Sequence, residues 1–403
     1  MAKQQSPWQP RTTIGKILIS PILAFIQDSR AVGITLIACT VVSLLLTNTG
    51  FSAAYLAFWD KEVHLPLPGL HLPHTILHWI NDGLMALFFF MVGLEIKREL
   101  TIGELSSVRK SMLPLFAALG GMLVPAGLYF LFNMGTPYER GWGIPMATDI
   151  AFSLGILSLL GSRAPFGLKV FLTALAIIDD LGGILTIALF YTDTIHFQYL
   201  IAAAGLLALL LLFNKLKLQR LFLYYIPGIL LWYCILNSGI HATIAGVLLA
   251  FTIPLVRVES LIHGLHDTVN FIIMPLFALA NTAIVLPAEW SGIFNSTINY
   301  GVLAGLCLGK PIGISLVSFL AVKLKIGTLP EGVSWHHIIG AGIIAGIGFT
   351  MSIFIATLAF TDESHQLIAK IAIMSASLIS GIAGFVYLSL LSKKQGADPD
   401  LST

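Results

Sequence analysis

Charged residues are scarce in this chain. Only 10% of its 403 residues are Asp, Glu, Lys or Arg, and 57% are hydrophobic, whereas soluble domains average about 25% and about 45 to 50%. A soluble core does not need so much apolar sequence, but repeated apolar runs of about 20 residues are what a bilayer requires. The composition therefore excludes an ordinary soluble domain and indicates an integral membrane protein.

Several chemical signatures are also missing. The three cysteines, Cys39, Cys234 and Cys307, lie in apolar runs without paired or metal-ligand spacing, so we expect small buried side chains. The chain has no HExxH motif and no Walker-type phosphate loop, which disfavours transport driven directly by ATP. With a net charge of +2 and no basic run, we expect no nucleic-acid partner. We expect no cofactor either.

The apolar runs are separated by charges, prolines and glycines. They predict an all-α membrane protein with about twelve transmembrane helices. We expect one polytopic membrane domain over residues 1–392 and a short polar tail over residues 393–403. The predicted helices are centred near residues 39, 87, 122, 151, 179, 205, 230, 248, 276, 310, 348 and 379.

The basic residues predict the orientation. The N-terminus lacks a convincing signal cleavage site, so we expect it to be retained. An even number of spans places both termini on one side. Nearly all lysines and arginines fall in the termini and in the loops of that side, which the positive-inside rule makes cytoplasmic. The exceptions are Lys61 and Arg140 on the opposite side, and Lys310 and Lys370 within spans.

Two predicted spans are rich in glycine. The fourth covers residues 141–155 and the eleventh residues 340–352, with Thr148 and Thr350 just past the expected breaks. They are the second members of segments 3 to 5 and 10 to 12. Interrupted spans in matching positions indicate inverted-topology repeats with two discontinuous helices. The alternative is that the glycines only let helices pack closely.

Two adjacent acids, Asp179 and Asp180, lie within the apolar stretch 171–190. Each carboxylate at mid-bilayer depth costs roughly 2.5 to 3.5 kcal/mol, so such acids indicate a functional site. Neighbours on a helix diverge by about 100°, so we expect them to have different partners. A site of carboxylates that binds either a proton or a hard cation suits Na+ or Li+. The alternative is a pair neutralised by Lys310 that only holds helices together.

Three further residues are expected at the same depth. Asp149 directly follows the break of the fourth span, where it either offsets the positive ends of two half-helices or binds the ion. Thr148 and carbonyl groups at the break would complete an oxygen shell. Lys310 either pairs with Asp179 and acts as a candidate proton carrier or extends to the interface.

Polar residues also occur near the ends of spans. Asp82, at the external end of the second span, either lines an ion funnel or caps a helix. Glu95, Arg98 and Glu99, at the other end of that span, either attract cations or form an ordinary solvated helix end. Three histidines that titrate near physiological pH are expected beside the cytoplasmic ends of the eighth and ninth spans, where packing is the alternative: His241, His263 and His266.

The longest external connection, about residues 49 to 74, alternates apolar residues around Pro68 and Gly69. This pattern favours a small hairpin. Its prolines, which lack an N–H donor, favour an irregular loop instead. Both interpretations remain open at this stage.

Five motifs resemble those of the NhaA sodium/proton antiporters of bacterial inner membranes, a family with inverted repeats. The resemblance extends over nearly the whole chain. The motifs are Ala147-Thr-Asp-Ile-Ala-Phe152, Ala174-Leu-Ala-Ile-Ile-Asp-Asp-Leu-Gly182, Gly239-Ile-His-Ala-Thr243, Gly309-Lys-Pro311 and Gly346-Ile-Gly-Phe-Thr-Met-Ser-Ile-Phe354.

The resemblance implies a role for each residue. Asp180 would be the principal cation and proton site, and Asp179 its essential neighbour. Asp149 and Lys310 would compensate the charges of crossed half-helix ends. Asp82 would belong to the external funnel, and the cytoplasmic pH response would involve Glu95, Arg98, Glu99, His241, His263 and His266.

One departure concerns the pH response. Ile262 stands where the family has a glutamate, and Glu259 is the nearest acid. The pH set point is therefore left open. The external hairpin would form a homodimer contact, which its prolines weaken.

The expected function is electrogenic Na+(Li+)/H+ antiport by alternating access, in which inward proton flow extrudes cytoplasmic sodium. The resemblance implies a multi-pass, lipid-embedded protein of the inner membrane, with both termini cytoplasmic and roles in pH regulation and salt tolerance. A cation channel built on the same acids is the second hypothesis. An intramembrane aspartyl enzyme is disfavoured, because adjacent residues on one helix form a poor catalytic pair.

Overall fold

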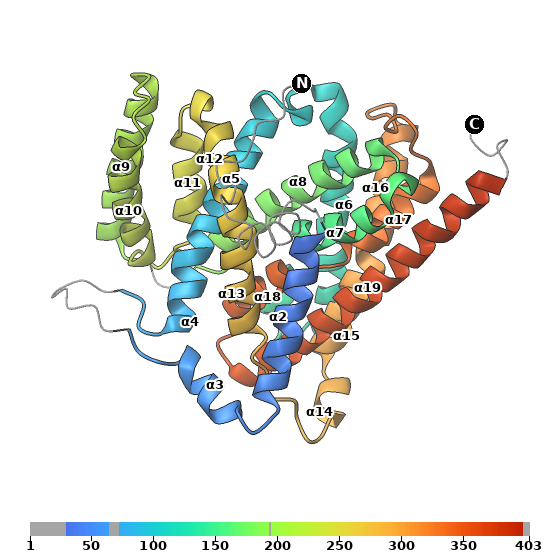
Figure 1. Cartoon of the computed structure of the whole chain (residues 1–403), viewed down its shortest axis with the longest axis horizontal. Helices are drawn as coiled ribbons and strands as arrows, with labels where there is room; N and C mark the ends of the chain where they lie inside the picture. Colours follow the sequence, from blue (N-terminus) through green and yellow to red (C-terminus); the bar gives the residue numbers. More distant parts are fainter. Residues whose placement is uncertain (1–29, 64–71, 193–194, 398–403) are drawn as a thin grey trace, which may run out of the picture.

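The computed structural model describes residues 30–63, 72–192 and 195–397, which fold into a bundle of helices (Figure 1). The described part contains no β-strand, only an isolated antiparallel bridge between Glu62 and Thr75. The Val63 N–H donates to the His74 carbonyl over 2.8 Å beside this bridge. The two ends of the predicted hairpin are thus paired, and its centre, including Pro68 and Gly69, lies outside the described residues.

The first half of the chain forms helices up to α9. In order they are α2 (Ala31–Thr47), α3 (Ser52–Trp59), α4 (Ile76–His78), the π-helix η1 (Trp79–Leu84), α5 (Met85–Thr101), the 3-10 helix η2 (Glu104–Ser106), α6 (Val108–Asn133), the 3-10 helix η3 (Glu139–Met146), α7 (Ile150–Leu159), the 3-10 helix η4 (Gly161–Arg163), α8 (Phe166–Phe190) and α9 (Phe197–Lys215).

The second half continues to the long helix α19. The elements are α10 (Phe222–Leu236), α11 (Ile244–Thr252), α12 (Leu255–Thr268), the π-helix η5 (Val269–Ile273), α13 (Met274–Asn281), α14 (Ser291–Phe294), α15 (Thr297–Ala304), the π-helix η6 (Gly305–Gly309), α16 (Lys310–Lys323), α17 (Trp335–Ala345), α18 (Phe349–Ala359) and α19 (Glu363–Ala397).

The all-helical membrane fold is confirmed. Among the described residues, eight helices are long and apolar enough to cross a membrane, or up to ten if each of two bent pairs is one span. The predicted number was about twelve. Each predicted centre falls in a helix or, near residue 348, at a helix break, but α10 has 15 residues and α11 only 9. Helix α11 ends early because Pro254 restricts Ile253 to an extended conformation.

The first members of the two predicted repeats, α6 and α16, pack directly against each other. A Cβ atom on Gly120 of α6 would collide with the Gly313 carbonyl of α16. A Cβ on Gly309 would lie 2.8 Å from the Pro125 Cα atom. The lack of a side chain therefore allows close helix packing at three glycines spaced four residues apart, a spacing that predicts such packing: Gly301, Gly305 and Gly309.

A second group of helices surrounds its own apolar cluster. Phe90 and Leu94 of α5 pack there with buried residues of α9, α10, α11 and α12. Figure 1 shows α9 and α10 on one flank of the bundle and α19 slanting across the opposite flank. Helix α19 continues to Ala397, past residue 393, where the polar tail was expected to begin.

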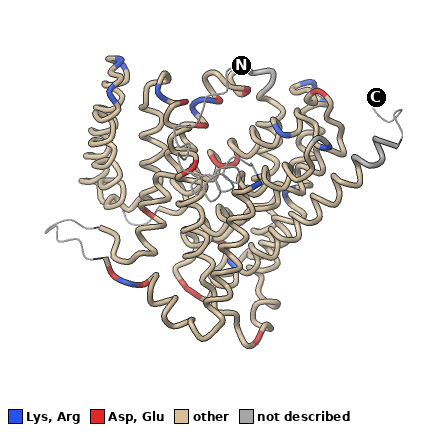
Figure 2. The backbone as a smooth tube through the Cα atoms, in the orientation of Figure 1, with Lys and Arg blue, Asp and Glu red and all other residues tan. Residues whose placement is uncertain are grey.

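Basic residues gather at one end of the molecule (Figure 2). This end, called the basic end below, contains the α9–α10 turn, the C-terminal end of α5 and the α16–α17 connection. Acidic segments also lie near mid-height of the bundle, far from either end (Figure 2). Apolar helices thus surround a buried polar centre.

Candidate ion-exchange site

Two broken helices cross at the centre of the bundle. Helix η3 ends at Met146, α7 begins at Ile150, and residues 147–149 between them are extended. Helices α17 and α18 are bent by 47° at their break. The two breaks touch, because the Asp149 N–H donates to the Ile347 carbonyl over 2.7 Å. The predicted discontinuous helices are therefore present.

Asp149 accepts hydrogen bonds from both half-helices that begin at the crossing. Its Oδ1 accepts from the Phe152 N–H of α7 over 3.0 Å. Its Oδ2 accepts from the Thr350 N–H of α18 over 3.1 Å and from the Thr350 hydroxyl. A carboxylate at two helix N-termini offsets the partial positive charge of both. This arrangement fits the dipole-compensating interpretation, and binding of the ion by Asp149 stays a prediction.

Serines complete the crossing in a reciprocal way. Ser153 of α7 donates to the Ile344 carbonyl near the end of α17 over 3.3 Å. Ser352 of α18 donates to the Ile144 carbonyl near the end of η3 over 2.8 Å. Each broken span thus donates a serine hydroxyl to a carbonyl near the broken end of the other, as expected of two inverted halves.

Helix α19 supplies one more cap. The Ser377 hydroxyl accepts the Phe349 N–H at the start of α18 over 3.1 Å. Sequence reasoning did not identify these three serines, because a serine within an apolar helix has many uses and none shows in the pattern. Only their positions beside the broken ends reveal what they bind.

Lys310, Asp179 and Thr148 form a buried polar triad. The Lys310 ammonium lies 2.6 Å from Asp179 Oδ2, and both side chains are 0% exposed. Lys310 also donates to the Thr148 hydroxyl over 2.8 Å, and this hydroxyl lies 2.8 Å from Asp179 Oδ2. The ammonium is therefore held at the centre of the bundle and does not extend to an interface.

The neighbouring acids have different surroundings, as their divergence on a helix predicts. No described residue forms a hydrogen bond with the Asp180 side chain, which lines an open cavity. Asp179 Oδ1 is buried and also has no partner among the described residues. These carboxylate oxygens are the acceptors that remain available at the crossing.

A cavity of about 440 Å³, called the funnel below, leads from the α5 and α12 ends toward these acids. Its polar lining includes Glu95, Arg98 and His266 on these two helices. The remaining lining residues come from α2, α5, α7 with its N-cap Asp149, α8, η5, α13 and α18: Val32, Phe88, Met91, Val92, Asp149, Ile150, Ala151, Leu154, Thr173, Ile177, Asp180, Asn270, Met274, Thr350 and Met351. The funnel thus joins a charged mouth to the buried carboxylates of Asp149 and Asp180.

A chain of ion pairs borders the mouth. Arg98 Nη2 lies 2.9 Å from Glu99 Oε1, and Arg98 Nη1 lies 3.7 Å from Glu259 Oε2. Glu259 Oε1 lies 3.2 Å from His263 Nε2. Ile262 is buried in the apolar cluster. Glu259 links α5 and α12 through its contact with Arg98.

His241 does not lie with the other predicted pH-response residues, so its expected location was wrong. It lies in the α10–α11 turn, away from the basic end. Its Nε2 is 2.8 Å from the carbonyl oxygen of Tyr191, at the end of α8. His241 lies in the connection between the seventh and eighth predicted spans, which the predicted topology itself places on the side opposite the termini.

Asp82 lies in η1, at the opposite end of the same span from Glu95. Its carbonyl accepts the Trp232 indole N–H of α10 over 2.8 Å. Asp82 does not line the funnel. This placement fits a residue of the opposite face and leaves its role as an external funnel acid a prediction.

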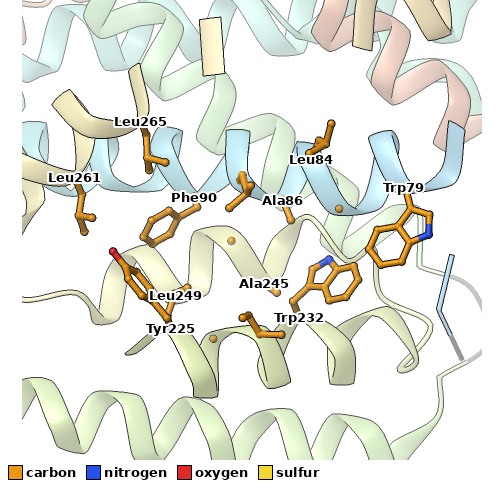
Figure 3. A pocket seen from close by; sticks show the side chains of 15 residues that line it. Trp79, Leu84, Ala86, Phe90, Tyr225, Trp232, Ala245, Leu249, Leu261 and Leu265 are labelled. Carbon is orange, nitrogen blue, oxygen red and sulfur yellow. The ribbon is translucent and has the colours of Figure 1, made fainter. Parts of the chain in front are cut away.

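A cavity larger than the funnel is apolar. It has a volume of about 800 Å³, lies between α5, α10, α11 and α12, and contains no Asp, Glu, Lys, Arg or His in its lining (Figure 3). Trp79 and Trp232 point toward each other at one end of it (Figure 3), with ring centroids 5.9 Å apart. Its walls offer an ion no charge, so the smaller funnel is the candidate site.

Comparison with known proteins identifies the family. The sequence profile of the family described as Na+/H+ antiporter 1 matches residues 23–388. The chain is 52% identical over 378 residues to Na(+)/H(+) antiporter NhaA 2 of Flavobacterium johnsoniae, covering 92% of this chain and 93% of that protein. It is 48% identical over 376 residues to NhaA of Cytophaga hutchinsonii, covering 92% and 95%. It is 44% identical over 418 residues to NhaA of Helicobacter pylori, covering 92% and 95%. The chain therefore belongs to the Na+/H+ antiporter 1 family, whose members are membrane transporters and not enzymes.

Proposed function

We propose that this protein is an electrogenic Na+(Li+)/H+ antiporter in which Asp180 is the exchanging ligand. The observation that carries the proposal is the position of Asp180 in the funnel, beside two crossed helix breaks and without a hydrogen-bond partner in the described part of the chain. A free carboxylate in such a place binds either a hard cation or a proton. Cation and proton therefore compete for one site, which is the requirement for antiport.

Lys310 and Asp179 are the proposed second titrating unit. When Asp179 turns toward a bound cation, Lys310 loses its partner at 2.6 Å and is left as an unpaired buried ammonium. Such a group readily releases its proton, because burial disfavours the charged form. Release of protons from both Asp180 and Lys310 exchanges more than one proton for each cation, which makes transport electrogenic.

The opposite side of the acids is nearly closed, which favours alternating access over a channel. Asp179 and Asp180 border a second cavity of only about 10 Å³, walled by Phe89, Ile184 and Phe354 among others. A space of roughly 10 to 15 Å³ holds at most a single water. Movement of the crossed half-helices would then open this side while the funnel closes.

The basic end is the proposed cytoplasmic end, with both termini on that side of a bacterial inner membrane. The funnel then opens to the cytoplasm, and inward proton flow extrudes sodium, which serves salt tolerance and pH regulation. The ion-pair chain of Arg98, Glu259 and His263 is the proposed pH-responsive element. Homodimerisation through the external hairpin belongs to the proposal as well.

Everted membrane vesicles test the function. Addition of Na+ or Li+ to vesicles energised by respiration should dequench a pH-sensitive dye. Asp180→Asn should abolish the response because the amide cannot exchange a proton. Glu331→Gln, which removes the charge of an exposed glutamate in the α16–α17 connection, should leave it intact. A full response from Asp180→Asn would refute the role of Asp180, and sodium flux without counterflow of protons would indicate a channel.

A further inference from the structure

The middle of the funnel carries an asparagine that none of the proposed steps uses. His266, Asn270 and Met274 follow at intervals of four residues and all line the funnel. They therefore form one stripe along α12, η5 and α13. Asn270 lies within the π-helix η5, which spans Val269–Ile273. Single π-turns occur frequently at functional sites.

Helix α8 contributes two more polar residues to the funnel. Thr173 and Asp180 of α8 both line the funnel, and their separation of seven residues corresponds to about 10 Å along the helix. The Thr173 hydroxyl donates to the Lys169 carbonyl over 2.9 Å, so its oxygen remains free to accept. A neutral oxygen thus precedes the acid on α8.

The Asn270 carboxamide has no hydrogen-bond partner among the described residues, although its side chain is half-buried. Polar groups in such positions normally have a partner. Many of the other side chains that line the funnel contain no oxygen: Phe88, Met91, Val92, Leu154, Ile177, Met274 and Met351. A cation that sheds water along this wall finds oxygen ligands chiefly at Asn270 and Thr173.

We propose that Asn270 is a specificity-determining residue of the entry path, and that its carboxamide oxygen replaces water around Na+ or Li+ between Glu95 and Asp180. This inference rests on the proposed antiport. Hard cations prefer oxygen ligands, and a path conducts well when each site binds strongly enough to admit the ion but weakly enough to release it. A neutral oxygen satisfies both conditions, whereas a carboxylate would retain the cation and take up protons.

Kinetics of Na+ and Li+ exchange in proteoliposomes test this proposal. Asn270→Leu keeps the approximate size and removes the oxygen, so the KM for Na+ should rise about two- to tenfold, the worth of one neutral ligand, while the rate at saturating Na+ is kept. The ratio of the KM values for Na+ and Li+ should also change. Asn270→Asp should lower the KM and the maximal rate together, because its charge holds the cation longer.

Thr268→Leu is the matched control, since Thr268 is exposed on the same helix and does not line the funnel. It should leave both KM values unchanged. If folded Asn270→Leu loses rate at an unchanged KM, Asn270 has a structural role and the inference is overturned. A raised KM in Asn270→Asp would overturn it as well. Failure of the antiport proposal itself gives different results. In that case the unmodified protein exchanges no protons for Na+, or Asp180→Asn remains active.

Discussion

The buried pair of Lys310 and Asp179 permits a quantitative prediction about stability. Their charged atoms are 2.6 Å apart and their side chains are 0% exposed. At an effective dielectric constant of about 20, two unit charges at this distance attract by about 6 kcal/mol. Removal of each ion from water costs several kcal/mol, so the intact pair contributes little net stability. Removal of only one partner leaves the other uncompensated.

We therefore expect Lys310→Met to lower the free energy of unfolding by about 3 to 5 kcal/mol at neutral pH. The loss should shrink in acid, because a protonated Asp179 carries no charge that needs compensation. The double variant Lys310→Met with Asp179→Leu should recover most of the loss, because an apolar pair of similar volume replaces the ion pair. Both variants should lose transport.

Equilibrium unfolding of the purified protein in mixed micelles, followed by tryptophan fluorescence, measures these differences. The four proteins of the double-mutant cycle give the coupling energy directly. Asp179→Leu alone completes the cycle. Additive losses, with a double variant as unstable as the sum of the single ones, would refute the direct coupling of these two charges.

Three further predictions concern the crossing and its packing. Asp149→Ala should lower the free energy of unfolding by about 2 to 4 kcal/mol, because the N-termini of α7 and α18 each lose a cap worth roughly 1 to 2 kcal/mol. Thermal unfolding of the purified protein measures this loss. An unchanged midpoint would contradict the capping of both helices by Asp149. The KM for Na+ should fall by up to about tenfold per unit of rising pH while one proton competes for Asp180; initial rates from pH 6 to 9 give this slope, and a KM independent of pH would exclude competition. Gly309→Val should disrupt the packing of α6 against α16, because even a Cβ atom at this position would lie 2.8 Å from Pro125 Cα. A variant of native stability in detergent would show that the helices separate easily. The control is Gly127→Val, at a position with open space.

The sequence was sufficient to predict the helical membrane fold and both broken spans. Apolar runs respond to the thickness of the bilayer, and glycines beside polar residues at mid-span have few uses other than an interruption. By length and composition only eight to ten described helices qualify as full spans. Helix α11, for example, is apolar enough for a span but contains only 9 residues. Hydropathy detects apolar character well, but the length of a helix also depends on its ends.

The acids at the crossing were recognised because burial of charge is costly and therefore rare. The same reasoning fails for residues that are ordinary in composition. Ser153 and Ser352 look unremarkable in the chain, and their partners lie more than a hundred residues away. Asn270 is recognised only because it lines a funnel built by several helices. His241 shows a different error. It was grouped with the predicted pH-response residues because its side chain titrates, but it lies at the other end of the bundle, beside the Tyr191 carbonyl.

What the sequence alone determined is which residues had to be at membrane depth: Asp149, Asp179, Asp180 and Lys310 lie in apolar stretches that bilayer thickness places there. Only the tertiary structure decided how they divide their contacts. Asp149 received two helix N-termini, Asp179 received Lys310, and Asp180 was left facing the funnel. The physical reason is that hydropathy acts on each segment separately, whereas the partner of a buried charge depends on which segments cross at the same depth.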